Sequence, residues 1–128
     1  MWPPNAGNAY AMTGEMARLT VVFRVAARRS KEVVAALRFL MATTRLEPGC
    51  RNCGVWIDSD SAVRYLEEWA TELDLRERVR SERFTSLLSV IESVEEPPLV
   101  QFDFVTTTRG LDYVAEVRGR LTPDASGS

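Results

Sequence analysis

The sequence predicts an α+β fold in one domain, with the element order β-α-β-β-α-β. Four segments alternate apolar and polar side chains with the period of two that is typical of strands. Two longer segments between them repeat their apolar residues with the helical spacing of three and four. The chain has 128 residues, the usual size of one domain, and its 45% hydrophobic residues are enough for a packed core.

The first strand is predicted within residues 16–27, where the alternating apolar side chains are Leu19, Val21, Phe23 and Val25. A helix follows, with Ser30 as the predicted N-cap. Its apolar stripe is formed by Val33, Val34, Leu37, Leu40 and Met41. Pro48 cannot continue a helix and Gly49 favours a turn, so the helix is expected to end before them.

The second and third strands are predicted over Cys50–Ile57 and Ala62–Trp69. The polar residues 58–61 between them are typical of a hairpin turn. Thr71 followed by Asp74 predicts a capped helix, and Ser81 is a possible second N-cap where that helix breaks. The apolar face of this helix is formed by Leu75, Val79, Leu87, Leu88 and Ile91.

Pro97 and Pro98 end the second helix, and Leu99–Val105 is the fourth predicted strand. Residues 111–118 fit either a strand or a short helix, and the spacing slightly favours the helix. The whole order is ferredoxin-like, with four antiparallel strands and two helices on one face. The predicted division is a flexible arm over 1–15, one domain over 16–120 and a flexible tail over 121–128.

Such a sheet leaves one face without helices. Burial of that face against a second copy predicts a homodimer.

Composition excludes several classes of function. The chain has no histidine, which removes histidine-based acid–base catalysis and histidine-ligated haem or zinc. No metal site is therefore expected, and the absence of a cofactor is what the family resemblance described below implies. A net charge of −2 without a long basic run makes nucleic acid a poor partner, and no apolar run is long enough to span a membrane. The first residues lack the pattern of a targeting signal, so we expect a cytoplasmic protein.

Three short motifs resemble the antibiotic biosynthesis monooxygenase domain family. They are the turn Leu46-Glu47-Pro48-Gly49-Cys50, the strand end Tyr65-Leu66-Glu67-Glu68-Trp69, and the helical segment Val79-Arg80-Ser81-Glu82-Arg83-Phe84. The resemblance extends over about residues 19–105. It implies a dimeric α+β barrel and, in the oxidising relatives, a cofactor-free monooxygenase that uses molecular oxygen on a small aromatic phenol or quinol. Many relatives carry histidines in the second helix, where this chain has Arg78 and Arg83.

The resemblance also implies where a substrate would bind, in a cavity between the sheet and the helices. Tyr65 and Trp69 match the positions expected to be catalytic. Asn52 and Trp56 lie on the matching face of the second strand, and Arg83 is a candidate for stabilising a phenolate. Aromatic residues on strands are also common core residues, and that reading is favoured for Trp69.

Other candidate residues have two readings each. Arg78 and Arg83 could line the mouth of the cavity, but exposed arginines paired with nearby carboxylates are favoured. One of Glu67 and Glu68 must point inward, where it would be a candidate base or the partner of an arginine. Cys50 and Cys53 are three residues apart on a strand and are expected on opposite faces, as ordinary thiols.

The sequence leaves two functions open, a cofactor-independent monooxygenase and a non-catalytic dimeric module that binds a small ligand or assembles.

Overall fold

A computed structural model describes residues 16–106 and 110–119 of the chain. Among them are four strands: β1 (Met16–Phe23), β2 (Cys50–Ile57), β3 (Val63–Trp69) and β4 (Leu99–Val105). The four described helices are α2 (Ala27–Thr44), α3 (Glu72–Arg80), α4 (Phe84–Ser93) and α5 (Asp112–Gly119). The ferredoxin-like α+β fold is confirmed. The predicted arm and tail lie outside the described residues, so the division into arm, domain and tail stays a prediction.

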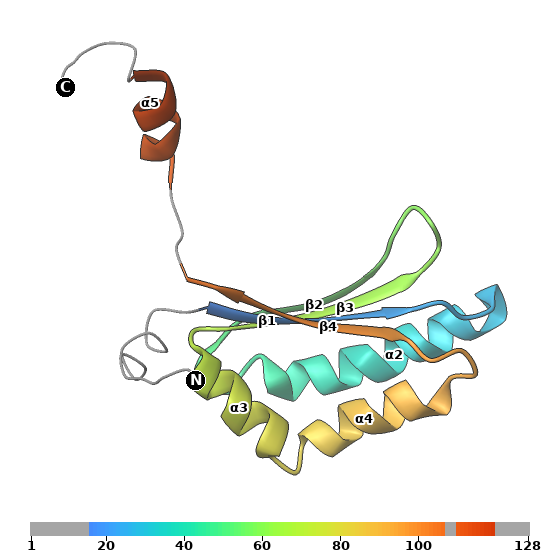
Figure 1. The fold of residues 1–128 in the computed structure, drawn as a ribbon. Coiled ribbons are helices and arrows are strands. Elements are labelled where there is room, and N and C mark those ends of the chain that lie inside the picture. The colour runs from blue at the N-terminus through green and yellow to red at the C-terminus, as the bar shows by residue number, and fades with distance from the viewer. Residues whose placement is uncertain (1–15, 107–109, 120–128) are drawn as a thin grey trace.

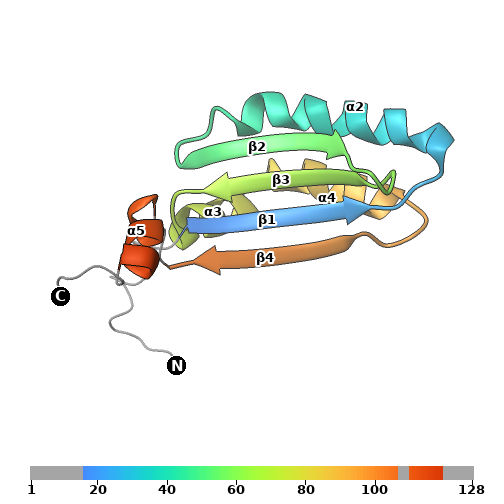
Figure 2. The same ribbon diagram turned by 90° about the horizontal axis from the view of Figure 1, so that it is seen from above.

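The four strands form one antiparallel sheet in the order β2-β3-β1-β4 (Figure 2). β1 pairs Leu19 with Glu67 of β3, and it pairs Leu19 with Phe102 of β4 on its other side. Directly opposed residues share a face, so the register sorts every side chain of the sheet into two sets. β4 is one edge of the sheet and β2 is the other.

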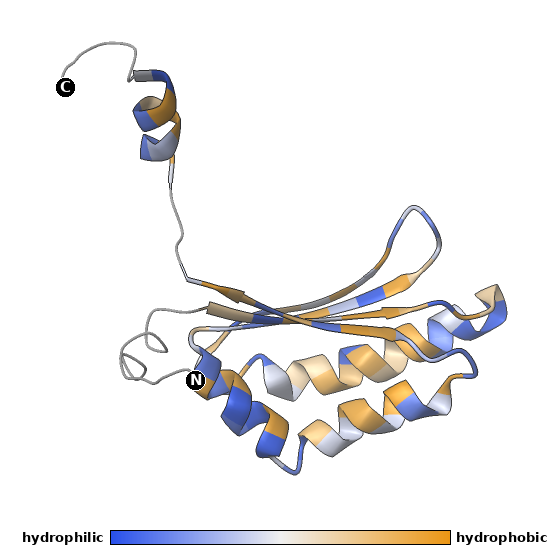
Figure 3. Cartoon of the chain, in the orientation of Figure 1, coloured by the Kyte–Doolittle hydropathy of each residue, from blue (hydrophilic) through white to orange (hydrophobic). Residues whose placement is uncertain are grey.

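Helices α2, α3 and α4 cover one face of the sheet, and α5 stands on the other side (Figure 1). The core lies between that sheet face and the helices, and its buried members include Leu19, Phe23, Leu37 and Leu87. α2 and α4 are largely hydrophobic, whereas α3 is largely hydrophilic (Figure 3). α3, the least apolar of these helices, packs beside the end of β3 that carries Trp69 and the start of β1 that carries Ala17.

Three local predictions need correction. α2 begins at Ala27, before the expected cap, and Ser30 lies inside the first turn, where its hydroxyl donates to the Ala27 carbonyl. The second helix does break at Ser81, but Ser81 ends α3 and donates its hydroxyl to the Arg78 carbonyl instead of capping α4. β1 ends at Phe23 rather than near residue 27. The Thr71 cap is confirmed, since its hydroxyl accepts from the Asp74 N–H at 3.1 Å.

The face of the sheet that α2, α3 and α4 leave uncovered is mixed in character. It carries Trp56 and Leu99, both exposed, between charged side chains. Arg18 pairs with Glu68 at 2.9 Å, and Arg64 pairs with Asp58. The Arg64 hydrogen bond is the main reason that the pKa of Asp58 is lowered. A second copy placed on this face would therefore meet ion pairs as well as apolar side chains.

Residues 112–119 form a helix, so the favoured reading of the ambiguous segment is confirmed. No helix in the described parts of the chain is both long enough and apolar enough to cross a membrane.

Candidate active site

The structure separates the predicted site residues into three places. Tyr65 and Trp69 lie on the helix side of β3, where both are buried. Asn52 and Trp56 are opposite Glu68 and Arg64, which places them on the helix-free face. Arg83 precedes α4, with a largely exposed side chain. The chain thus brings Tyr65 and Trp69 together and keeps the other three apart from them.

The side chains of Tyr65 and Trp69 meet at the carboxylate of Glu67. Tyr65 donates its hydroxyl to Oε2 at 2.5 Å, and the Trp69 indole N–H donates to Oε1 at 3.0 Å. Glu67 lies two residues from each of them, so the strand period of two turns all three side chains to one face. The inward position of one glutamate is confirmed, and Glu68 points outward to Arg18.

Arg78 of α3 completes the environment of this carboxylate. Its Nε donates to Oε1 of Glu67 at 3.1 Å and its Nη2 donates to Oε2 at 2.7 Å, a bidentate arrangement. The side chains of Glu67 and Arg78 are 0% and 2% exposed, so the exposed position expected for Arg78 is wrong. A carboxylate accepts about four hydrogen bonds, and all four positions of Glu67 are occupied.

A short chain of charges connects the buried pair with the surface. Nη1 of Arg78 is 3.7 Å from Oε2 of Glu47, and Nη1 of Arg83 is 3.4 Å from the same oxygen. The guanidinium of Arg78 also lies over the ring of Phe84, 5.3 Å from its centroid. Two arginines and two glutamates therefore link β3, α3, the start of α4 and the turn before β2.

The turn before β2 is fixed by a close approach. Gly49 has a φ of +90°, a conformation that side chains with a Cβ rarely adopt. A Cβ at Gly49 would lie 2.5 Å from Cγ of Asp74, so no other residue fits without movement. The Gly49 carbonyl accepts from the Ala70 N–H at 2.8 Å. The turn is thereby attached to the segment that joins β3 to α3.

Cys50 and Cys53 share a face of the sheet, which corrects the prediction that they lie on opposite faces. The register between β2 and β3 shifts between Cys50 and Asn52, so Cys50 is opposite Trp69 and Cys53 is opposite Glu67. A bulge of this kind adds one residue and turns the next side chains to the other face. The Cys53 thiol lies 3.5 Å from the Tyr65 hydroxyl oxygen, to which it donates.

Burial and the Glu67 charge set the protonation states of these groups. Burial raises the pKa of Cys53 to about 11, and burial also raises the pKa of Cys50. Burial, reinforced by Glu67, raises the pKa of Tyr65 far above its usual range. Burial alone would lower the pKa of Arg78, but its hydrogen bonds and charge interaction with Glu67 raise it overall. The site at neutral pH therefore holds two neutral thiols, a neutral phenol and a charged guanidinium.

This arrangement limits the chemistry available to the cluster as it stands. Glu67 has no free lone pair with which to take a proton, and the hydroxyl of Tyr65 is already committed to it. Tyr65 and Glu67 are 0% exposed, so no space large enough for water touches either side chain. The described residues contain no group of three or more ligands that could hold a metal ion.

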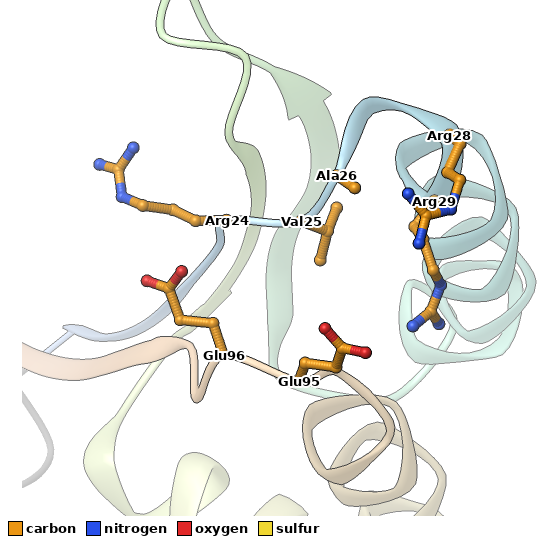
Figure 4. A pocket seen from close by; sticks show the side chains of 7 residues that line it. All are labelled: Arg24, Val25, Ala26, Arg28, Arg29, Glu95 and Glu96. Atoms are coloured by element: carbon orange, nitrogen blue, oxygen red, sulfur yellow. The ribbon is translucent and has the colours of Figure 1, made fainter.

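Two clefts among the described residues lie away from this cluster. One, of about 200 Å³, separates the start of α2 from the loop between α4 and β4. Its lining is charged, and the carboxylates of Glu95 and Glu96 point into the space flanked by Arg24 and Arg29 (Figure 4). A second, of about 290 Å³, lies on the helix-free face of the sheet. Neither is lined by a residue that the sequence predicts for the site.

Comparison with known proteins gives a fold. No protein-family model and no curated protein sequence matches this chain. A Nitrosomonas europaea protein described as a "putative antibiotic biosynthesis monooxygenase" is 16% identical, with a TM-score of 0.63 over 76% of this chain and 96% of that one. A Caulobacter crescentus protein with the same description is 14% identical, with a TM-score of 0.63 over 81% and 100%. A Bacteroides thetaiotaomicron protein of unknown function, described as a possible oxidoreductase, is 19% identical, with a TM-score of 0.61 over 73% and 99%.

These solved structures confirm the resemblance at the level of the fold. The chain has the fold of proteins described as antibiotic biosynthesis monooxygenases. The identities are too low to transfer an activity, because one fold hosts many functions.

The sequence alone did not identify the Glu67–Arg78 pair, although it held two signals for it. Alternation along β3 places Glu67 on the same face as Tyr65 and Trp69. Arg78 follows Leu75 by three residues, which puts it on the apolar face of α3. A charged residue at a buried position of each element indicates a buried pair.

Proposed function

We propose that this chain is a cofactor-independent monooxygenase that oxidises a small aromatic phenol or quinol with molecular oxygen. The observation that carries the proposal is the pair of buried rings, Tyr65 and Trp69, held beside a charged arginine in a fold described for monooxygenases. A phenolate gives an electron to oxygen far more readily than a neutral phenol does. A protein therefore contributes by binding the ring, orienting it and stabilising its negative charge.

In this proposal the rings of Tyr65 and Trp69 are the catalytic surface. The substrate would enter beside Cys50, the half-buried residue that packs against Trp69. Arg83 would stabilise the phenolate at the surface end of the charge network. Asn52 and Trp56 would contact a ligand on the helix-free face, because the sheet separates them from the buried rings.

The test is oxygen uptake by the purified chain with a panel of hydroquinones and phenols, without added metal or flavin. We expect uptake above the protein-free blank, slowed by Trp69→Phe and by Tyr65→Phe. Phe39→Leu is the control, because Phe39 is an exposed aromatic residue on α2. An uptake equal to the blank across the whole panel would contradict the monooxygenase.

A second function, a non-catalytic module that binds a small ligand or assembles, is favoured by one observation. Glu67 and Tyr65 are fully enclosed and the four acceptor positions of Glu67 are filled, so substrate binding would require the packing to open. The discriminating measurement is tryptophan fluorescence with the same panel. Saturable quenching without oxygen uptake would support the module over the enzyme.

We further propose that two copies associate through the helix-free face. Exposed Trp56 and Leu99 on that face support it, since a large apolar surface is costly in water. Light scattering at micromolar concentration should give twice the mass of the chain. A mass equal to one chain at every concentration would contradict the association.

A further inference from the structure

The helix-covered face of the sheet is left open at strand β4. Leu19 is buried on that face and is directly opposite Phe102. Phe102 therefore belongs to the same face, and so do Val100 and Phe104, two residues away on either side. Val100, Phe102 and Phe104 are 42%, 42% and 46% exposed. Among the described elements β4 has substantial contact with β1 alone, and the helices lie along the other three strands (Figure 2).

These three side chains, Val100, Phe102 and Phe104, form what we call the β4 patch. The patch continues the buried face sideways, because Phe104 is opposite Ala17, which is opposite Trp69 on its other side. Apolar side chains on the edge strand of a sheet invite another segment of chain to pack there. A segment that covered the β4 patch would bury two phenylalanine rings and extend the core to the edge of the sheet.

The residues that precede β1 have the composition of such a cover. Residues 1–15 lie outside the described part of the chain, and Glu15 is the one charged side chain among them. By contrast, 27% of the whole chain is charged. Trp2, Tyr10 and Met12 are large and mainly apolar, so their burial is favourable. Segments that stay in solvent are typically rich in charge, so this composition favours a buried position.

The same residues join the sheet at one end of the β4 patch. Met16, the first residue of β1, is directly opposite Val105, the last residue of β4. Residues 1–15 span up to about 50 Å when extended, whereas the seven residues of β4 span about 23 Å. Gly14 tolerates the backbone angles of a reversal. The segment is therefore long enough to turn back beside Met16 and to run along the whole of β4.

The spacing of apolar side chains on the two segments agrees. Met12 and Tyr10 are two residues apart, so an extended backbone turns both side chains to one face. Phe104 and Phe102 have the same spacing along β4. A reversal over residues 13–15 would place Met12 on Phe104 and Tyr10 on Phe102. Sulfur–aromatic and aromatic–aromatic contacts would then add to the burial of apolar surface.

We propose that residues 1–15 fold back onto their own sheet and dock on the β4 patch, with Met12 on Phe104 and Tyr10 on Phe102. The docked segment closes the open side of the layer between sheet and helices, next to Ala17. Docking restrains residues that the sequence alone predicts to be flexible. The proposal requires neither the oxidation nor the association of two copies proposed above.

The rate at which a thiol reagent labels a cysteine in the β4 patch tests the docking. The background is the full chain with Cys50→Ala and Cys53→Ala, so that an introduced cysteine is the only thiol. Tyr10→Asp combined with Met12→Asp should raise the labelling rate of Val100→Cys about tenfold, because the cover is lost. The same two changes should leave the labelling of Phe39→Cys unchanged, since Phe39 is exposed on α2.

A cross-link identifies which chain supplies the cover. In the same background, Met12→Cys with Phe104→Cys should form an internal disulfide on oxidation by a copper–phenanthroline complex. The product is a monomer of increased mobility in non-reducing electrophoresis. Met12→Cys with Lys31→Cys, a pair that includes an exposed position on α2, should form no such product.

Every other outcome contradicts a stated part. A labelling rate that the two aspartates leave unchanged overturns the docking, and the β4 patch is then free for a different partner. A disulfide-linked dimer assigns the cover to the segment of a second copy and overturns docking within one chain. Faster labelling without any cross-link overturns the placement of Met12 on Phe104. Oxygen uptake plays no part in these measurements, so the monooxygenase proposal stands or fails separately.

Discussion

Replacement of Arg78 by methionine is expected to lower the free energy of unfolding by about 3 to 5 kcal/mol, the usual cost of removing one partner of a buried ion pair. Arg78 is 2% exposed and supplies two of the four hydrogen bonds that Glu67 accepts. Its loss leaves a buried carboxylate with only the donors Tyr65 and Trp69. Methionine fills much of the volume of the arginine side chain, so the cavity contribution stays small and the cost is mainly electrostatic.

Two further variants isolate the electrostatic cause. Arg76→Met changes an arginine on the same helix whose partner, Glu72, is four residues away on the exposed side, and it should cost less than about 0.5 kcal/mol. The pair Glu67→Gln and Arg78→Met should cost at least about 2 kcal/mol less than the sum of the single variants, because the double variant leaves no unpaired charge at the pair.

Urea denaturation followed by both fluorescence and circular dichroism gives these free energies, provided that the two signals coincide. An Arg78→Met variant as stable as Arg76→Met would refute the reasoning. Single effects that simply add would refute it too, because addition means that Glu67 and Arg78 do not depend on each other.

Three smaller predictions use the same unfolding measurement. Gly49→Ala should cost about 2 to 3 kcal/mol, because φ is +90° and the new methyl meets Asp74; an unchanged midpoint would contradict this. Thr71→Ala should cost about 1 kcal/mol through the lost helix cap, and a full loss of stability would point to another role for Thr71. The pKa of Cys53 is raised to about 11, so its contribution is complete below about pH 9, the unfolded value, and is lost as pH rises through 11. Wild type should therefore lose about 2 kcal/mol more than Cys53→Ala between pH 8 and pH 11, and parallel profiles would exclude the effect.

Hydrophobic periodicity predicted the elements and their order, because β1, β3, α2 and α4 each bury one face against the same core. It did not predict where α2 begins. Apolar spacing says nothing about the first turn, and Ser30 satisfies its hydroxyl equally well inside the helix. It also did not predict the bulge in β2, since one extra residue leaves the composition of the strand unchanged while it moves Cys50 to the face of Cys53.

The candidate site was predictable residue by residue but not as a group. Alternation turned Tyr65, Glu67 and Trp69 to one face, and helical spacing turned Arg78 inward. That these side chains meet depends on how α3 lies on the sheet, which is a long-range property. The separation of Asn52 and Trp56 from Tyr65 likewise follows from the register of β2 against β3, which the sequence does not state.

Each motif that carries the resemblance has a structural role in this chain. Glu47 forms ion pairs with Arg78 and Arg83. Gly49 lacks the Cβ that would collide with Asp74, and the Trp69 indole N–H donates a hydrogen bond to Glu67. These contacts hold together the turn before β2, the end of β3 and the α3–α4 junction, and they would do so in a chain with any activity or none. A chain can therefore keep all three motifs for stability alone. Shared motifs therefore indicate a shared framework, whereas a shared activity requires an accessible ring surface, which the oxygen-uptake measurement tests directly.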